Sequence, residues 1–206
     1  MPKKNKKSQD RKIANFLYEV GTMRKLIRAH RQVLLTDDLS DSISSHSYRV
    51  AVIAWFLAKE SGADPYKTVM MGILHDMGEA RSNDHNWVHK RYVCIHDEEI
   101  QKEQLGSLPY PDLKELVDEY EERTSIEAIL AKDADLLDQV LLLREYEWQG
   151  NKEAALWLRG KSKEKKTGNA QLSRLKTAVA KRIGQVICSE SPSNWWNSLW
   201  TSKNRK

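Results

Sequence analysis

The stretch Val69-Met-Met-Gly-Ile-Leu-His-Asp-Met-Gly-Glu79 decides what kind of fold this chain can adopt. Its apolar residues recur at helical spacing, which predicts an amphipathic or buried helix. His75 and Asp76 lie in the middle of that pattern, where an unpaired charge would cost too much free energy to keep. Both side chains must therefore be paired, hydrogen-bonded or bound to a metal ion. On a helix, Glu79 projects from the same side as this pair.

The length and the cysteine content indicate one large domain with reduced thiols. A chain of 206 residues can bury a sizeable core, and Cys94 and Cys188 do not make a disulfide framework. The sequence has no apolar run near the ~20 residues of a membrane span. The basic N-terminus has no cleavage site of a signal peptide. We therefore expect a cytoplasmic protein without a membrane partner.

The formal charge of +5 belongs to the two ends of the chain. Residues 1–12 carry six Lys/Arg and one Asp, and residues 203–206 carry three Lys/Arg, so the ends sum to +8 and the remainder to −3. Basic ends are usually solvated and disordered, and we expect mobile tails at residues 1–11 and 201–206. Nucleic acid is therefore an unlikely partner, although an RNA-associated role of the tails stays an alternative.

The periodic segments all predict helices, and no segment predicts a strand, so the fold class is all-α. Gly62-Ala-Asp-Pro65 predicts the end of one helix and the start of the next, with Asp64 as N-cap. Residues 31–36 suggest an extended or irregular piece. We expect a single domain over residues 12–200, with a core at 12–150 and C-terminal helices at 151–200. Helices are expected at residues 12–27, 46–61, from 65 through the His75-Asp76 pair, 100–105, 113–150, 152–158 and 172–186.

Further metal ligands can come from the neighbouring helices. The tight turn at residues 62–65 makes the helix that begins with His46 a neighbour of the one that carries His75 and Asp76. One aspartate from residues 113–150 would complete two histidines and two carboxylates, a set that suits Mn, Co, Zn or Fe better than Ca. Helical counting slightly favours Asp133 over Asp135, but that helix is apolar nearly all round, so counting decides little.

Three motifs together resemble a known family. Ser44-Ser-His-Ser-Tyr-Arg49, Leu74-His-Asp-Met-Gly-Glu79 and Lys132-Asp-Ala-Asp-Leu136 are similar to motifs of the 5′-deoxynucleotidase branch of the HD-domain phosphohydrolases. The resemblance covers roughly residues 12–150. It implies an all-helical bundle, commonly a homodimer, that uses one divalent metal (Co, Mn, Mg, Zn or Fe) to hydrolyse deoxyribonucleoside monophosphates. The metal ligands that it implies are His46, His75, Asp76 and Asp135.

The resemblance also implies roles for residues around the metal. Glu79 would position or activate water, and Asp84 would be a second acidic residue that assists proton transfer. Arg31, fifteen residues before His46, would contact the substrate phosphate, for which a guanidinium is well shaped. The stretch Asn86-Trp-Val-His-Lys-Arg-Tyr92 is typical of a branch-specific signature, from which Lys90 or Arg91 would add a second phosphate contact.

Some residues depart from the family pattern. Glu79-Ala-Arg-Ser-Asn-Asp84 lacks the Gly-Asp pair and the proline that usually follow the glutamate, and Gln32 replaces a tryptophan that excludes the ribose 2′-hydroxyl in some members. The sugar preference is therefore left open. Other HD chemistries (a triphosphohydrolase, a phosphodiesterase or a (p)ppGpp hydrolase) and a binding module without turnover remain alternatives. Trp195, Trp196 and Trp200 are more typical of a packing or dimer patch than of a base-stacking platform.

Overall fold

The computed structural model describes residues 3–160, 170–197 and 199. These residues form helices and turns, with one isolated antiparallel bridge between Ile27 and Ser42 and no strand, so the all-α prediction is confirmed for the described part of the chain. In chain order, with η for a 3₁₀ turn, the elements are α1 (Lys3–Gly21), η1 (Thr22–Lys25), α2 (His30–Leu34), α3 (Ile43–Ser61), α4 (Pro65–Leu74), α5 (Glu79–Ser82), η2 (His89–Arg91), α6 (Asp97–Leu105), α7 (Asp112–Glu122), α8 (Ile126–Trp148), α9 (Lys152–Arg159), η3 (Leu172–Arg174), α10 (Ala178–Ser189) and α11 (Asn194–Asn197).

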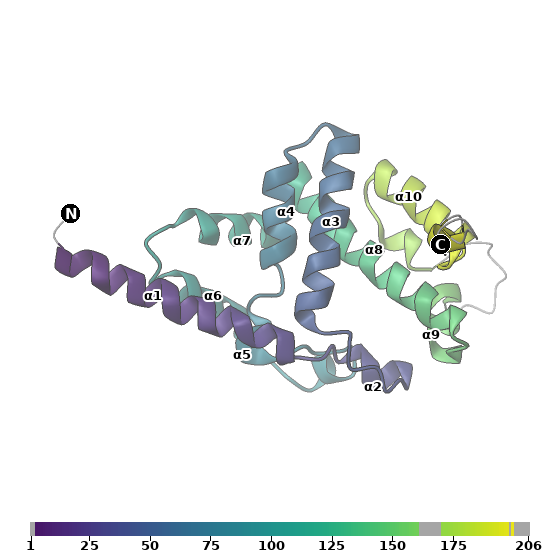
Figure 1. Ribbon diagram of the computed structural model, residues 1–206, viewed down its shortest axis with the longest axis horizontal. Coiled ribbons are helices and arrows are strands. Elements are labelled where there is room, and N and C mark those ends of the chain that lie inside the picture. Colours follow the sequence, from purple (N-terminus) through teal and green to yellow (C-terminus); the bar gives the residue numbers. More distant parts are fainter. Residues whose placement is uncertain (1–2, 161–169, 198, 200–206) are drawn as a thin grey trace, which may run out of the picture.

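The centre of the molecule is the antiparallel pair α3 and α4, which packs against α8 (Figure 1). The turn between α3 and α4 forms as predicted. Gly62 adopts a left-handed φ of 71°, and the Asp64 side chain accepts hydrogen bonds from the backbone N–H groups of Tyr66 and Lys67. Gly72 lets the two helices approach closely, because a Cβ there would lie 3.3 Å from the Ala51 Cα.

α8 is the buried axis of the fold. Leu130, Ala134 and Leu137 are fully buried between α3 and α10. The prediction of one helix over residues 113–150 was wrong, because the chain breaks between α7 and α8. Arg123 takes a left-handed φ of 55° after α7, and the Ser125 side chain caps the first turn of α8.

Several boundaries differ from those predicted. α1 begins at Lys3, so residues 3–11, expected to form a mobile tail, belong to a helix, and its N-terminal end extends beyond the other elements (Figure 1). Lys, Arg and Gln are good helix formers and need no apolar pattern to continue a helix. Residues 30–34, expected to be irregular, form α2. α10 begins at Ala178 rather than at 172, after its N-cap Thr177.

Parts of the predicted organisation fall on residues that the structure does not describe. The linker over residues 161–169, the tail at 201–206 and Trp200 lie outside the described residues. Within the described residues, every helix is too short or too polar to cross a lipid bilayer.

Candidate metal centre

The His75-Asp76 pair lies at the end of α4. The prediction that the pair sits in the middle of a helix was wrong: α4 ends at Leu74, His75 is its C-cap, and Asp76 belongs to the turn that leads into α5. The Met77 and Glu79 N–H groups close this turn through hydrogen bonds to the Leu74 and Asp76 carbonyls. At this turn the Asp76 side chain is 23% exposed, whereas the His75 side chain is 2% exposed.

His46, His75, Asp76 and Asp135 come together from α3, the turn after α4, and α8. The Nε2 atoms of His46 and His75 are 3.2 Å apart. The Asp76 Oδ2 atom lies 3.3 Å from the His46 Nε2 and 3.1 Å from the His75 Nε2. The Asp135 Oδ1 atom lies 3.3 Å from the His46 Nε2. Neighbouring ligands of one ion at about 2.1 Å are separated by about 3 Å, so this spacing fits a single divalent cation.

Contacts at the Nδ1 atoms orient both imidazole rings. The His46 Nδ1 lies 2.6 Å from the Asp138 Oδ2, and the His75 Nδ1 lies 2.9 Å from the Gly72 carbonyl oxygen. In a metal-bound site these acceptors would hold a proton on each Nδ1, so that each Nε2 presents a lone pair to the ion. Two facing lone pairs repel unless a proton or a cation lies between them, and the carboxylates of Asp76 and Asp135 make the donor set that of a divalent metal.

The electrostatics keep the two carboxylates ionised. Burial alone would raise the pKa of Asp76, but the neighbouring His75 and His46 lower it below its usual range. Burial likewise opposes ionisation of Asp135, and its hydrogen bond from His46 and the charge of Lys132 lower its pKa well below the usual value. The carboxylates of Asp76 and Asp135 are therefore ionised and available to bind a cation.

In contrast to Asp76 and Asp135, Glu79 has a raised pKa. It is the first residue of α5, and its Oε2 atom is buried and has no hydrogen-bond partner within the described part of the chain. Burial, followed by the charges of Asp76 and Asp84, raises the pKa of Glu79 to about 9. In the metal-free site this carboxyl group is therefore protonated at neutral pH.

Asp84 lies beside the metal centre and also has a structural contact. The residue is buried, lines the cavity described below, and accepts a hydrogen bond from the Ala29 N–H. The buried Asn86, which the sequence analysis did not single out, donates to the Ala29 carbonyl and to the Gln32 Oε1. Asn86 therefore attaches its loop to α2 through two hydrogen bonds, one to the Ala29 carbonyl and one to the Gln32 side chain.

The structure places Arg28, not Arg31, at the metal centre. Arg31 is on the outside of α2, where its guanidinium contacts the Thr36 carbonyl and Asp37. Arg28 is 7% exposed, and its Nη1 lies 2.6 Å from the His46 Nδ1. The Ile27–Ser42 bridge brings the segment that carries Arg28 alongside the start of α3.

Asp133 and Asp135 have different partners. The fully buried Asp133 accepts hydrogen bonds from the backbone N–H groups of Lys176 and Thr177 and from the Thr177 hydroxyl. Its carboxylate therefore holds the start of α10, whereas Asp135 faces the histidines. Asp138, one turn after Asp135, is a second residue that the sequence analysis did not identify. It contacts His46, Arg28 and Arg49.

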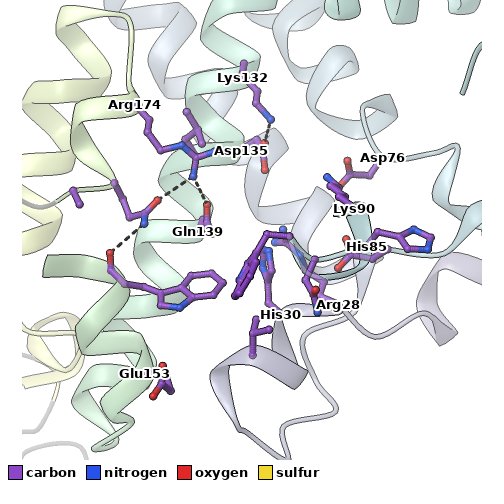
Figure 2. Close-up of a pocket in the computed structure, with 18 of the residues that line it drawn as sticks. Arg28, His30, Asp76, His85, Lys90, Lys132, Asp135, Gln139, Glu153 and Arg174 are labelled. Carbon is purple, nitrogen blue, oxygen red and sulfur yellow. Dashed lines mark hydrogen bonds and ion pairs between the residues drawn. The ribbon is translucent and has the colours of Figure 1, made fainter. Parts of the chain in front are cut away.

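A cavity of about 670 Å³ opens from this centre. Asp76, Glu79, Asp84 and Asp135 line the end nearest the histidines, together with Arg28. Figure 2 shows residues of α8 on one wall facing the segment that carries Arg28 and His30 on the other. A second cavity of about 780 Å³ lies between α6 and α7, and His75, Asp76 and Glu79 line it as well. Lys90 and Lys132 line both cavities.

The histidines of the 85–96 segment do not join the metal centre. The rings of His85 and His89 pack edge to face, with centroids 5.6 Å apart. Within the described residues, the group of His, Cys, Asp and Glu side chains that converges closely enough for a metal contains His46, His75 and Asp135. Asp76, by the distances given above, lies next to both histidines of that group.

Comparison with known proteins agrees with this architecture. Residues 23–176 match the family model described as HD domain. The 5′-deoxynucleotidase HDDC2 of Bos taurus is 30% identical over 155 residues, which cover 71% of this chain and 73% of that protein. A conserved hypothetical protein from Pyrococcus furiosus superposes with a TM-score of 0.66 at 26% identity, covering 85% of this chain and 97% of the other. A predicted metal-dependent phosphohydrolase from Magnetospirillum magnetotacticum MS-1 has the same fold, with a TM-score of 0.64 at 22% identity over 88% and 92%. This chain belongs to the HD domain family.

Proposed function

We propose that this protein is a metal-dependent phosphohydrolase that converts nucleoside 5′-monophosphates, deoxyribonucleotides among them, to nucleoside and phosphate. One observation carries the proposal: two ionised carboxylates each place an oxygen within 4 Å of both imidazole Nε2 atoms at one end of a cavity of about 670 Å³, beside a buried arginine. This volume is in the range of pockets that take a single small molecule. The related HDDC2 protein of Bos taurus, described above, is named a 5′-deoxynucleotidase.

His46, His75, Asp76 and Asp135 would hold the metal. The geometry fits one ion of Mn, Co, Zn, Fe or Mg, and histidine together with carboxylate suits the transition metals best. A bound divalent ion would supply Lewis-acid activation of water and of the phosphoryl group. Asp138 and the Gly72 carbonyl would keep the two imidazoles in the metal-binding tautomer.

The remaining residues of the site would bind the phosphate and move protons. Arg28 replaces Arg31 as the proposed phosphate ligand, and Lys90 would add a second positive charge from η2. As water adds to phosphorus and the bond to the 5′-oxygen breaks, the Glu79 carboxyl group would give a proton to the leaving oxygen. Asp84 would take up the proton that the attacking water loses.

The decisive experiment is a panel of substrates and metals. Phosphate release is measured with ribo- and deoxyribonucleoside monophosphates and with triphosphates, each with Mn, Co, Mg or Zn. We expect turnover of monophosphates, and loss of both bound metal and turnover in Asp76→Ala. The matched control is Asp37→Ala, whose carboxylate is solvent-exposed and contacts Arg31. A metal-bound protein that releases no phosphate from any compound would instead be a nucleotide-binding module, and an active Asp76→Ala variant would exclude this site.

We also propose the cytoplasmic location, the single domain over residues 12–200 and the homodimer that the sequence suggests. Val52, Trp55 and Phe56 form an exposed apolar stripe on α3, which supports a contact with a second copy of this face. Sedimentation equilibrium should give twice the chain mass, and Phe56→Glu should shift it toward the monomer. Sedimentation of the unchanged protein as a monomer would contradict the dimer.

A further inference from the structure

The end of the cavity farthest from the metal centre is built by elements outside the central helices. α9 contributes Leu156 and Trp157, and the segment around η3 contributes Gln171 and Arg174. Backbone and side-chain hydrogen bonds attach this segment to α9. The Ala170 N–H donates to the Leu158 carbonyl at 2.8 Å, and the Gln171 Nε2 donates to the Trp157 carbonyl at 3.1 Å.

Arg174 is held in place by two uncharged groups. Its Nη1 donates to the Gln139 Oε1 at 3.2 Å and to the Gln171 Oε1 at 3.0 Å (Figure 2). Neither acceptor carries a charge that would neutralise the guanidinium. The two hydrogen bonds fix the plane of the guanidinium group. Arg174 is solvent-exposed and lies outside the catalytic contacts proposed above, so its guanidinium is available to a ligand in the cavity.

Gln139 lies between the metal centre and Arg174. It follows Asp135 by four residues on α8, which is a rise of about 6 Å along the helix axis. This step is comparable to the span of one sugar ring. A nucleotide with its phosphate at the metal centre would therefore bring its base, not its sugar, to Gln139 and Arg174.

The composition of this end suits a planar heteroaromatic ring better than a second phosphate. Trp157 and Leu156 offer aromatic and aliphatic surface, and the His30 ring packs edge to face on Trp157 with centroids 5.6 Å apart. Glu153 also lines the cavity and would repel a phosphate group. The Trp157 ring offers a stacking surface for a base, and an arginine can donate to the acceptor edge of a base.

We propose that the Arg174 fork reads the O6 and N7 acceptors of guanine, so that the enzyme prefers guanine nucleotides. This inference rests on the proposed phosphohydrolase function. With Nη1 committed to the two glutamine oxygens, the other guanidinium N–H groups supply donors toward the base. Arginine paired with the O6 and N7 of guanine is the commonest base-specific contact of this side chain. Adenine places a donor where guanine has O6, so it loses this pairing.

The test compares kcat/KM for dGMP, dAMP, dCMP, dTMP and 2-deoxyribose 5-phosphate, which has no base. In the unchanged protein we expect dGMP to be the best substrate. Arg174→Ala should lower kcat/KM for dGMP roughly tenfold to a hundredfold, the value of one good two-point base contact. Turnover of 2-deoxyribose 5-phosphate should stay unchanged. Arg174→Lys should not restore the preference, because an ammonium lacks the planar fork.

Arg182→Ala is the control, because that arginine lies on α10 and pairs with Glu60. Equal losses on dGMP and on 2-deoxyribose 5-phosphate in Arg174→Ala would overturn the inference, since they would show a structural or phosphate-binding role. Equal kcat/KM values for all four nucleotides in the unchanged protein would also overturn it while leaving the proposed function intact. If the unchanged protein released no phosphate from any of the five compounds, the proposed function itself would fail.

Discussion

The buried carboxyl groups around the metal centre have three different environments, although they are chemically alike. Asp76 faces two imidazoles and is ionised, whereas Glu79 is buried without a partner and carries a raised pKa. Asp138 lies behind His46 and contacts two arginines as well. The surroundings of each group, and not its residue type, therefore determine whether it binds a cation, holds a proton or orients a ligand.

Glu79 should make the metal-free protein less stable as pH rises. Its pKa is about 9 in the folded protein against an ordinary 4.5, so between these values the folded state keeps a proton that the unfolded chain releases. The free energy of unfolding therefore falls as pH rises through this window. Glu79→Gln should remove that slope and, above pH 7, stabilise the protein in EDTA by at least about 1 kcal/mol. Urea denaturation between pH 5 and 9 measures it, and parallel curves for both proteins would contradict the shifted pKa.

The same Glu79→Gln substitution should have the opposite effect on activity. An amide cannot give up a proton to the leaving 5′-oxygen, so kcat should fall by roughly a factor of a hundred to ten thousand. Bound metal, measured by elemental analysis, should stay at the level of the unchanged protein. A variant with normal kcat would exclude Glu79 as the proton donor.

Asp138 should control metal affinity without touching the ion. Replacing it with Asn weakens the acceptor behind the His46 Nδ1, and we expect the metal dissociation constant to rise roughly tenfold to a hundredfold. Glu145→Gln is the matched control, because Glu145 shares the partner Arg49 with Asp138 and does not contact His46. Competition with a metal-binding dye measures both constants. Equal weakening in the two variants would show that the Arg49 contact is responsible instead.

At the scale of elements, two aspartates that are close in the sequence of α8 have different roles. Asp135 points toward His46 of α3 and His75 at the end of α4, and Asp133 points toward the start of α10. Two residues apart on a helix are separated by about 200° around its axis, so they cannot share a neighbour. This rotation is why one helix can supply a metal ligand and also hold a covering helix in place.

Asp133→Ala should therefore affect stability, and Asp135→Ala should affect metal binding. Loss of the Asp133 carboxylate leaves the N–H groups of Lys176 and Thr177 without their acceptor, which should cost roughly 1 to 3 kcal/mol in the free energy of unfolding. Metal content should stay normal in Asp133→Ala at low temperature and be lost in Asp135→Ala. Denaturation and elemental analysis of both proteins measure the two properties, and loss of metal in the folded Asp133→Ala variant would contradict the assignment.

At the scale of the whole molecule, the metal centre joins segments that are far apart in the chain. Its residues come from α3, the turn after α4, and α8, which pack against each other at the centre of the molecule (Figure 1). A ligand set assembled only in the folded state couples metal binding to folding. The metal should therefore stabilise all three elements together.

Bound metal should raise the melting temperature of the entire protein. At a free metal concentration of a hundred times the dissociation constant, the expected stabilisation is about 2.7 kcal/mol. Thermal denaturation with Mn or Co and with EDTA measures it. Asp76→Ala should show no difference between the two conditions, and an equal rise in that variant would point to binding elsewhere.

The sequence by itself determined the fold class and three of the residues that converge at the metal centre. Helical periodicity and the Gly62–Pro65 turn depend on local backbone preferences, and these appear in the structure as predicted. His46, His75 and Asp76 could be chosen because polar side chains within apolar segments need a partner. These properties are local, so residue type and spacing are enough to predict them.

Only the tertiary structure decided which of several similar residues face the cavity. Arg28 rather than Arg31 lines the cavity, and Asp135 rather than Asp133 faces the histidines. The reason is that the direction of a side chain depends on where its element packs. Arg174 enters the cavity wall although it is 39 residues beyond Asp135 in the chain. Contacts between segments that distant arise from the packing of whole helices, and no pattern within a single helix contains that information.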